Sequence, residues 1–151
     1  EAGSDIVLAN TFGANALKYT DSKYKLEEII THAIENVKKA SSLGVQDGRE
    51  TYVALDVGPL GALLEPMGEL SFDDAYGLFA EVMDAGATAG ADLILIETMS
   101  DLKEAKAALL AAKERTSLPV FVTMTFGEDG RTFLGTDPAA AAVTLTSLGA
   151  M

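Results

Sequence analysis

The chain has 151 residues, 48% of them hydrophobic, which is typical of a single folded domain with its own core. Its formal net charge of −12 argues against nucleic acid or an anionic membrane as a partner, because both are bound by clustered lysine and arginine. The chain contains no cysteine, which excludes disulfides and thiolate metal sites built from its own residues. Without a long apolar run or a signal-peptide pattern, we expect a soluble, cytoplasmic protein.

Two strand-then-helix units open the chain. The first combines a predicted strand at Asp5–Ala9 with a helix at about Leu26–Leu43, whose apolar residues recur at helical spacing. The second has a strand at Thr51–Leu55 that ends at Asp56, followed by a loop rich in glycine and proline. Ser71 is then the predicted cap of the next helix.

Two further units follow in the same order. The apolar run Leu93–Ile96 predicts a strand buried on both faces, with Ser100 or Asp101 capping its helix. The last strand is predicted at Val120–Thr125, and Asp137 precedes a proline in the pattern of a helix start. This alternation predicts an α/β fold with a parallel sheet. The units fit either a self-contained doubly wound sheet or half of an eight-stranded β/α barrel.

Polar residues occupy the carboxyl ends of the predicted strands, where α/β folds bind their ligands. Asp56 and Glu97 are the two carboxylates, and they would suit a cationic or zwitterionic ligand. Amides and hydroxyls accompany them, at Asn10-Thr11, at Thr98 and in Thr123–Thr125. The alternative interpretation is that these side chains only cap helices and satisfy loop amides.

Two other features carry weaker signals. The loop from Asp56 to Gly61 could present backbone N–H groups to an anion, although glycine and proline more often mark a simple turn. His32 falls away from the apolar stripe of its helix, so we expect a solvated side chain rather than a ligand.

Several segments resemble homocysteine S-methyltransferase domains, most closely the homocysteine-binding domain of cobalamin-dependent methionine synthases. Asn10-Thr11-Phe12-Gly13-Ala14-Asn15 is similar to the T-N-T-F-G-A-N segment of that family. Later family segments resemble three stretches in the same order, which are Ala54 to Gly61, Gly90 to Met99 and Gly130 to Pro138. The resemblance covers nearly the whole chain, and the order of the motifs makes it more specific than any one of them.

The resemblance implies a (β/α)8 TIM barrel that transfers a methyl group to the homocysteine thiol and so makes methionine. The donor in this branch is methylcobalamin, supplied from methyltetrahydrofolate, and a zinc ion held by three cysteines activates the thiol. Carried onto this sequence, Glu97 would bind the homocysteine ammonium group. Asn10, Thr11, Asp56 and Thr98 would line the same pocket.

The chain also departs from the family pattern. Ala9 stands where the family usually has threonine, and the zinc cysteines have no counterpart here. Residues 1–151 therefore resemble a single partial barrel domain, units two to five. We expect the isolated chain to bind no zinc at a thiolate site, to be inactive, and to self-associate through open sheet edges.

Two alternatives remain at this point. A receiver-like signalling domain would use Asp56 as its phosphoacceptor, but the acidic pair and the strand-end lysine of such domains have no counterparts here. Another β/α barrel enzyme is also possible, such as a corrinoid or pterin methyltransferase. An aldolase is disfavoured because no predicted strand carries a lysine for a Schiff base.

Overall fold

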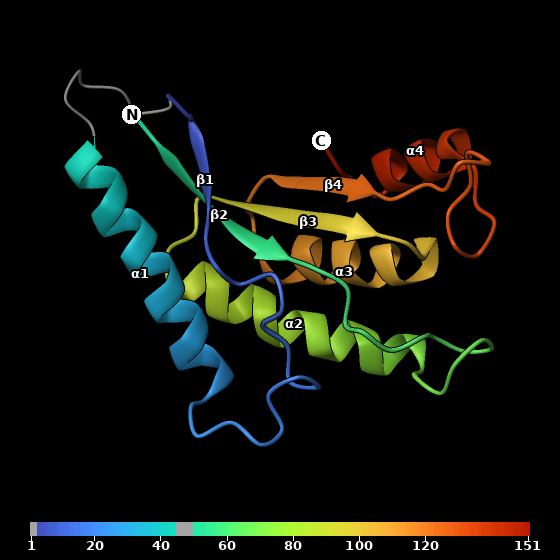
Figure 1. The fold of residues 1–151 in the computed structure, drawn as a ribbon, viewed down its shortest axis with the longest axis horizontal. Coiled ribbons are helices and arrows are strands. Elements are labelled where there is room, and N and C mark those ends of the chain that lie inside the picture. The colour runs from blue at the N-terminus through green and yellow to red at the C-terminus, as the bar shows by residue number, and fades with distance from the viewer. Residues whose placement is uncertain (1–2, 45–49) are drawn as a thin grey trace.

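The computed structural model describes residues 3–44 and 50–151, and it contains a parallel four-stranded sheet (Figure 1). The strands lie in the sheet in chain order, and a helix follows each of them. This arrangement confirms the predicted α/β fold. The elements are β1 (Ile6–Leu8), α1 (Leu26–Gly44), β2 (Tyr52–Val57), α2 (Phe72–Thr88), β3 (Leu93–Met99), α3 (Leu102–Arg115), β4 (Val120–Met124) and α4 (Pro138–Ser147).

Helices α1, α2 and α3 lie along one side of the sheet, with α4 beside β4 (Figure 1). The core fills the space between these helices and the strands, and its largest fully buried side chains include Phe79, Ile30 and Leu55. Gly86 allows α2 to approach the sheet closely, because a Cβ atom at this position would lie 2.4 Å from Cδ2 of Leu55. Leu55 therefore points toward the helices.

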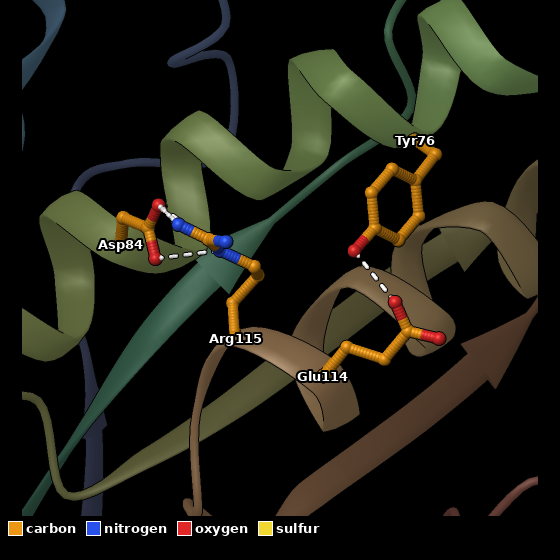
Figure 2. A network of polar contacts seen from close by, with 4 residues as sticks. All are labelled: Tyr76, Asp84, Glu114 and Arg115. Atoms are coloured by element: carbon orange, nitrogen blue, oxygen red, sulfur yellow. Dashed lines mark hydrogen bonds and ion pairs between the residues drawn. The ribbon is translucent and has the colours of Figure 1, made fainter.

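Polar contacts between side chains tie α2 to α3 at the surface (Figure 2). The Tyr76 hydroxyl donates to Oε2 of Glu114 at 2.7 Å. The Arg115 guanidinium donates through Nη2 to Oδ2 of Asp84 at 2.6 Å and through Nε to Oδ1 at 3.1 Å. The hydrogen bond to Glu114 raises the pKa of Tyr76, and Asp84 raises the pKa of Arg115. These contacts align two helices whose buried faces also pack together.

The helix starts follow the sequence signals. Ser71 caps α2, and its hydroxyl oxygen accepts a hydrogen bond from the backbone N–H of Asp74 at 3.0 Å. Asp101, not Ser100, caps α3, and Asp137 caps α4 with a proline in the first turn. His32 is exposed, as expected, with 76% of its side-chain area accessible. Helix α1 ends at Gly44.

The strand bounds differ from the predicted ones in a way that matters for the site. Strand β2 continues through Asp56 to Val57, and β3 continues through Glu97 to Met99. Hydrogen-bonding partners explain the extension, because Val57 pairs with Ile96 and Met99 pairs with Met124. Both carboxylates therefore belong to the sheet and are not loop residues.

The sheet face turned away from the helices is only partly covered. Ile6, Leu8 and Tyr52 are 45%, 40% and 47% exposed, and Leu95 is half-buried. The prediction that β3 is buried on both faces was therefore wrong at Leu95, because no helix of the described chain packs on that side (Figure 1). Among the described residues, no helix is both long and apolar enough to cross a membrane.

Candidate functional site

Asp56 lies near the carboxyl end of β2 and points away from the helices. Its neighbour Leu55 faces α2, and successive side chains of a strand alternate between the two faces. Asp56 pairs in register with Leu95, and Glu97 follows two residues later in β3. The two carboxylates thus come from adjacent strand ends on the same face of the sheet.

Thr11 fixes the backbone of Asp56. Its hydroxyl donates to the carbonyl oxygen of Asp56 at 2.8 Å and accepts from the backbone N–H of the same residue at 3.0 Å. Thr11 is 1% exposed, so these two bonds satisfy a buried hydroxyl. Its hydroxyl therefore supports Asp56 and is not free to contact a ligand.

The carboxyl group of Asp56 is buried and is not fully hydrogen-bonded within the described part of the chain. The residue is 6% exposed, and among the described residues its Oδ1 atom has no hydrogen-bond partner. Burial, with a smaller contribution from the nearby charge of Glu97, raises the pKa of Asp56 from its ordinary 3.8 to about 6. An unpaired buried carboxyl is costly, so such a group is more typical of a binding site than of a packed core.

Glu97 is half-buried, and the backbone directly after it is strained. Thr98 has φ of 56°, which is a genuine outlier for a β-branched residue. The register between β3 and β4 shifts between Ile96 and Met99, and the N–H of Thr98 donates to Oγ1 of Thr123 at 3.0 Å. Such irregularities redirect side chains, and they occur often beside functional sites.

Replacing Thr98 by glycine is expected to raise the free energy of unfolding by about 1 kcal/mol, because glycine adopts positive φ without steric cost. The N–H group that contacts Thr123 is kept in this variant. Urea denaturation of both proteins measures the difference. A loss of stability of the same size would show that the Thr98 conformation is not strained.

Two of the N–H groups in the loop after β2 that the sequence suggested for an anion are not free. Gly58 N–H donates to the carbonyl oxygen of Phe12 at 3.0 Å, and Leu60 N–H donates to Oε1 of Glu104 at 2.8 Å. Pro59 has no N–H, and its carbonyl accepts from Nζ of Lys18 at 3.1 Å. The hypothesis of an anion site was therefore wrong at these positions, since both amides are already bonded.

Sequence reasoning missed Glu104, which is 4% exposed in α3. A usable signal was present, because Glu104 begins the helical series Glu104, Ala107, Ala108 and Ala111, whose other members are buried alanines. A carboxylate in such a stripe indicates a buried polar contact. Burial raises the pKa of Glu104, and the hydrogen bond from Leu60 opposes this shift.

Asn10 is exposed just beyond β1, so the structure places it near the site but not inside a closed pocket. Within residues 3–44 and 50–151, no group of three or more histidine, cysteine or acidic side chains could hold a metal ion. The gathered groups are thus two carboxylates, of which Asp56 lacks a partner for one oxygen, with Thr11 bonded to the backbone of Asp56 and Thr98 directly after Glu97 in β3. This arrangement suits a small ligand with a positive charge.

Comparison with known protein families shows which family this chain belongs to. The family described as homocysteine S-methyltransferase matches residues 1–151. The chain belongs to the homocysteine S-methyltransferase family. The methionine synthase of Mycobacterium tuberculosis is 31% identical over 159 residues, which cover 99% of this chain and 13% of that protein. The methionine synthase of Mycobacterium leprae is 28% identical over 156 residues, with the same coverage.

A solved homocysteine S-methyltransferase shows the same fold. The metallated form of the homocysteine methyltransferase MmuM from Escherichia coli superposes with a TM-score of 0.82 at 20% identity. Its apo form superposes with a TM-score of 0.76 at 21% identity. These matches cover 98% of this chain and 54% to 56% of MmuM. The chain therefore spans about half the length of this structure and a much smaller share of the methionine synthases.

Proposed function

We propose that this chain is the homocysteine-binding part of an S-methyltransferase that methylates the homocysteine thiol to give methionine. The observation that carries the proposal is the Asp56–Glu97 pair, in which a buried carboxyl oxygen has no partner among the described residues. In this proposal Glu97 binds the substrate ammonium group, and Asp56 offers a second acceptor for its hydrogens. Asn10, Thr11 and Thr98 shape the surroundings of that pocket.

The residues of this chain do not fit the zinc site that the family resemblance implies. The chain has no cysteine, and its one histidine, His32, is exposed on α1. We therefore assign no metal chemistry to these residues. Under the proposal, residues 1–151 form units two to five of a TIM barrel, and other parts of a parent protein supply the zinc cysteines and the methylcobalamin donor. A cytoplasmic location remains part of the same proposal.

Isothermal titration of the chain with homocysteine tests the binding proposal directly. We expect saturable binding, weaker binding of the desamino analogue 4-mercaptobutyrate, and none of a reduced pterin. The analogue lacks only the ammonium group, so equal affinity for both thiols would contradict the assignment of the carboxylate pair. Binding of the pterin instead would favour another class of barrel methyltransferase.

A second measurement tests whether the chain alone methylates homocysteine. Incubated with zinc, homocysteine and methylcobalamin, the chain alone is expected to form no methionine, because it lacks the thiolate ligands that activate the substrate. Methionine analysis by mass spectrometry and metal analysis of the dialysed protein are the readouts. Stoichiometric zinc together with homocysteine-dependent turnover would refute the expectation.

We also propose that the 151-residue chain self-associates. Strands β1 and β4 are the edge strands of its sheet, and Ile6, Leu8 and Tyr52 place apolar surface on the face without helices. Unpaired edges and exposed apolar patches favour association. Light scattering at micromolar concentration is expected to show a dimer or larger species. A monodisperse monomer would contradict this.

A further inference from the structure

Glu104 is a buried carboxylate that has no direct role in the proposed binding of homocysteine. It is 4% exposed, and the other buried residues of α3 are alanines and one leucine. Burying a carboxylate is unfavourable unless it makes specific polar contacts. A residue that only filled space at this position would be apolar, so the contacts of Glu104 indicate its role.

Its contact lies in the loop that follows Asp56. Oε1 of Glu104 accepts the backbone N–H of Leu60 at 2.8 Å, across 44 residues of sequence. Two neighbouring bonds hold the same loop from another side of it: the N–H of Gly58 donates to the carbonyl oxygen of Phe12, and Nζ of Lys18 donates to the carbonyl oxygen of Pro59. Three consecutive loop residues are thus each fixed by one polar contact, and Glu104 supplies the only one of the three that comes from α3.

The effect of this contact reaches the candidate site through the backbone. Asp56 lies near the end of β2, and the fixed loop begins two residues later at Gly58. On the other side, Thr11 bonds both the N–H and the carbonyl of Asp56. The backbone is thus held at both ends of the stretch from Asp56 to Leu60, by Thr11 at Asp56 and by Glu104 at Leu60.

We propose that Glu104 is a positioning residue that, through Leu60, holds the β2–α2 loop in place and so keeps the Asp56 carboxyl buried beside Glu97. The consequence for homocysteine affinity rests on the proposed function, whereas the consequence for Asp56 itself does not. Glu104 acts only through the loop and does not contact the ligand.

Two substitutions of similar size separate this role from simple packing. Glu104→Gln keeps an oxygen that can accept from Leu60, whereas Glu104→Met removes the acceptor and fills the same space. Leu109→Ala is the matched control, because it destabilises the same helix from a fully buried position and leaves the Glu104 side chain in place. Chemical denaturation first confirms that each variant is folded.

The primary readout is the pKa of Asp56, measured by NMR titration of its carboxyl carbon. In the wild type and in Glu104→Gln we expect a value of about 6, and in Glu104→Met a value shifted toward 3.8 as the released loop admits water. Leu109→Ala should leave the value unchanged. An unchanged pKa in Glu104→Met, or a shift in Leu109→Ala of the same size, would overturn the proposal.

Homocysteine titration of the same proteins gives the second readout. Glu104→Met is expected to bind about tenfold more weakly, and Glu104→Gln within about threefold of the wild type. If the wild type binds no homocysteine, the proposed function fails, and the NMR titration still decides the role of Glu104. If binding is normal in Glu104→Met, Glu104 does not position the site.

Discussion

Glu97→Gln is expected to weaken homocysteine binding by about 50-fold, since it removes the charged partner of a substrate ammonium group and keeps the size of the side chain. The half-buried position of Glu97 at the end of β3 makes the loss larger than at an open surface, because water screens the interaction less there. Isothermal titration at neutral pH measures the change.

Glu128→Gln is the matched control, because Glu128 is exposed in the turn after β4 and carries no assigned role. It should leave the dissociation constant within about twofold, as is usual for a remote surface charge. Glu97→Gln should also lower the pKa of Asp56, because the charge of Glu97 contributes to raising it. Unchanged homocysteine affinity in Glu97→Gln would remove Glu97 from the binding site.

Asp56→Asn is expected to stabilise the chain at alkaline pH while it impairs binding. The folded chain holds the Asp56 proton more tightly than the unfolded chain, with a pKa of about 6 against an ordinary value of 3.8. Stability from this group is therefore fully present below the lower value and is lost as the pH rises through the higher one. Asparagine mimics the neutral carboxyl and avoids this loss.

The expected gain in the free energy of unfolding is about 2 to 3 kcal/mol at pH 8 and close to zero at pH 3.5. Urea denaturation of both proteins at the two pH values measures it, and the contributions of carboxylates that do not interact with Asp56 cancel in the difference. Asp21→Asn serves as an exposed control, for which no such pH-dependent gain is expected. A gain in Asp56→Asn that is the same at both pH values would show that the pKa of Asp56 is not raised.

The fold could be predicted from the sequence because the patterns that indicate it are local. Apolar periodicity, the caps at Ser71 and Asp137, and the alternation of strands with helices each depend on neighbouring residues. The ends of the strands were harder to predict from the sequence, because Asp56 and Glu97 join the sheet through partners in other strands. The sequence of one strand does not show where its pairing with another strand ends.

The candidate site was only partly predictable for the same reason. Carboxylates after apolar runs pointed to Asp56 and Glu97, since position along a strand is visible in a single segment. The contact between Glu104 and Leu60 joins residues far apart in the chain, and the positive φ of Thr98 arises where β3 shifts its register against β4. Neither can be read from local composition.

The order of the sheet has a consequence for how the chain is made. Strands β1 to β4 are neighbours in the same order in which a ribosome releases them, so no strand waits for a partner beyond the next unit. Each new strand and helix can dock on the edge left by the previous one during synthesis. Ribosome-bound chains halted after β3 should then already protect the amides of β2 from hydrogen exchange. Growth of this kind proceeds by addition of strands to one edge of the sheet.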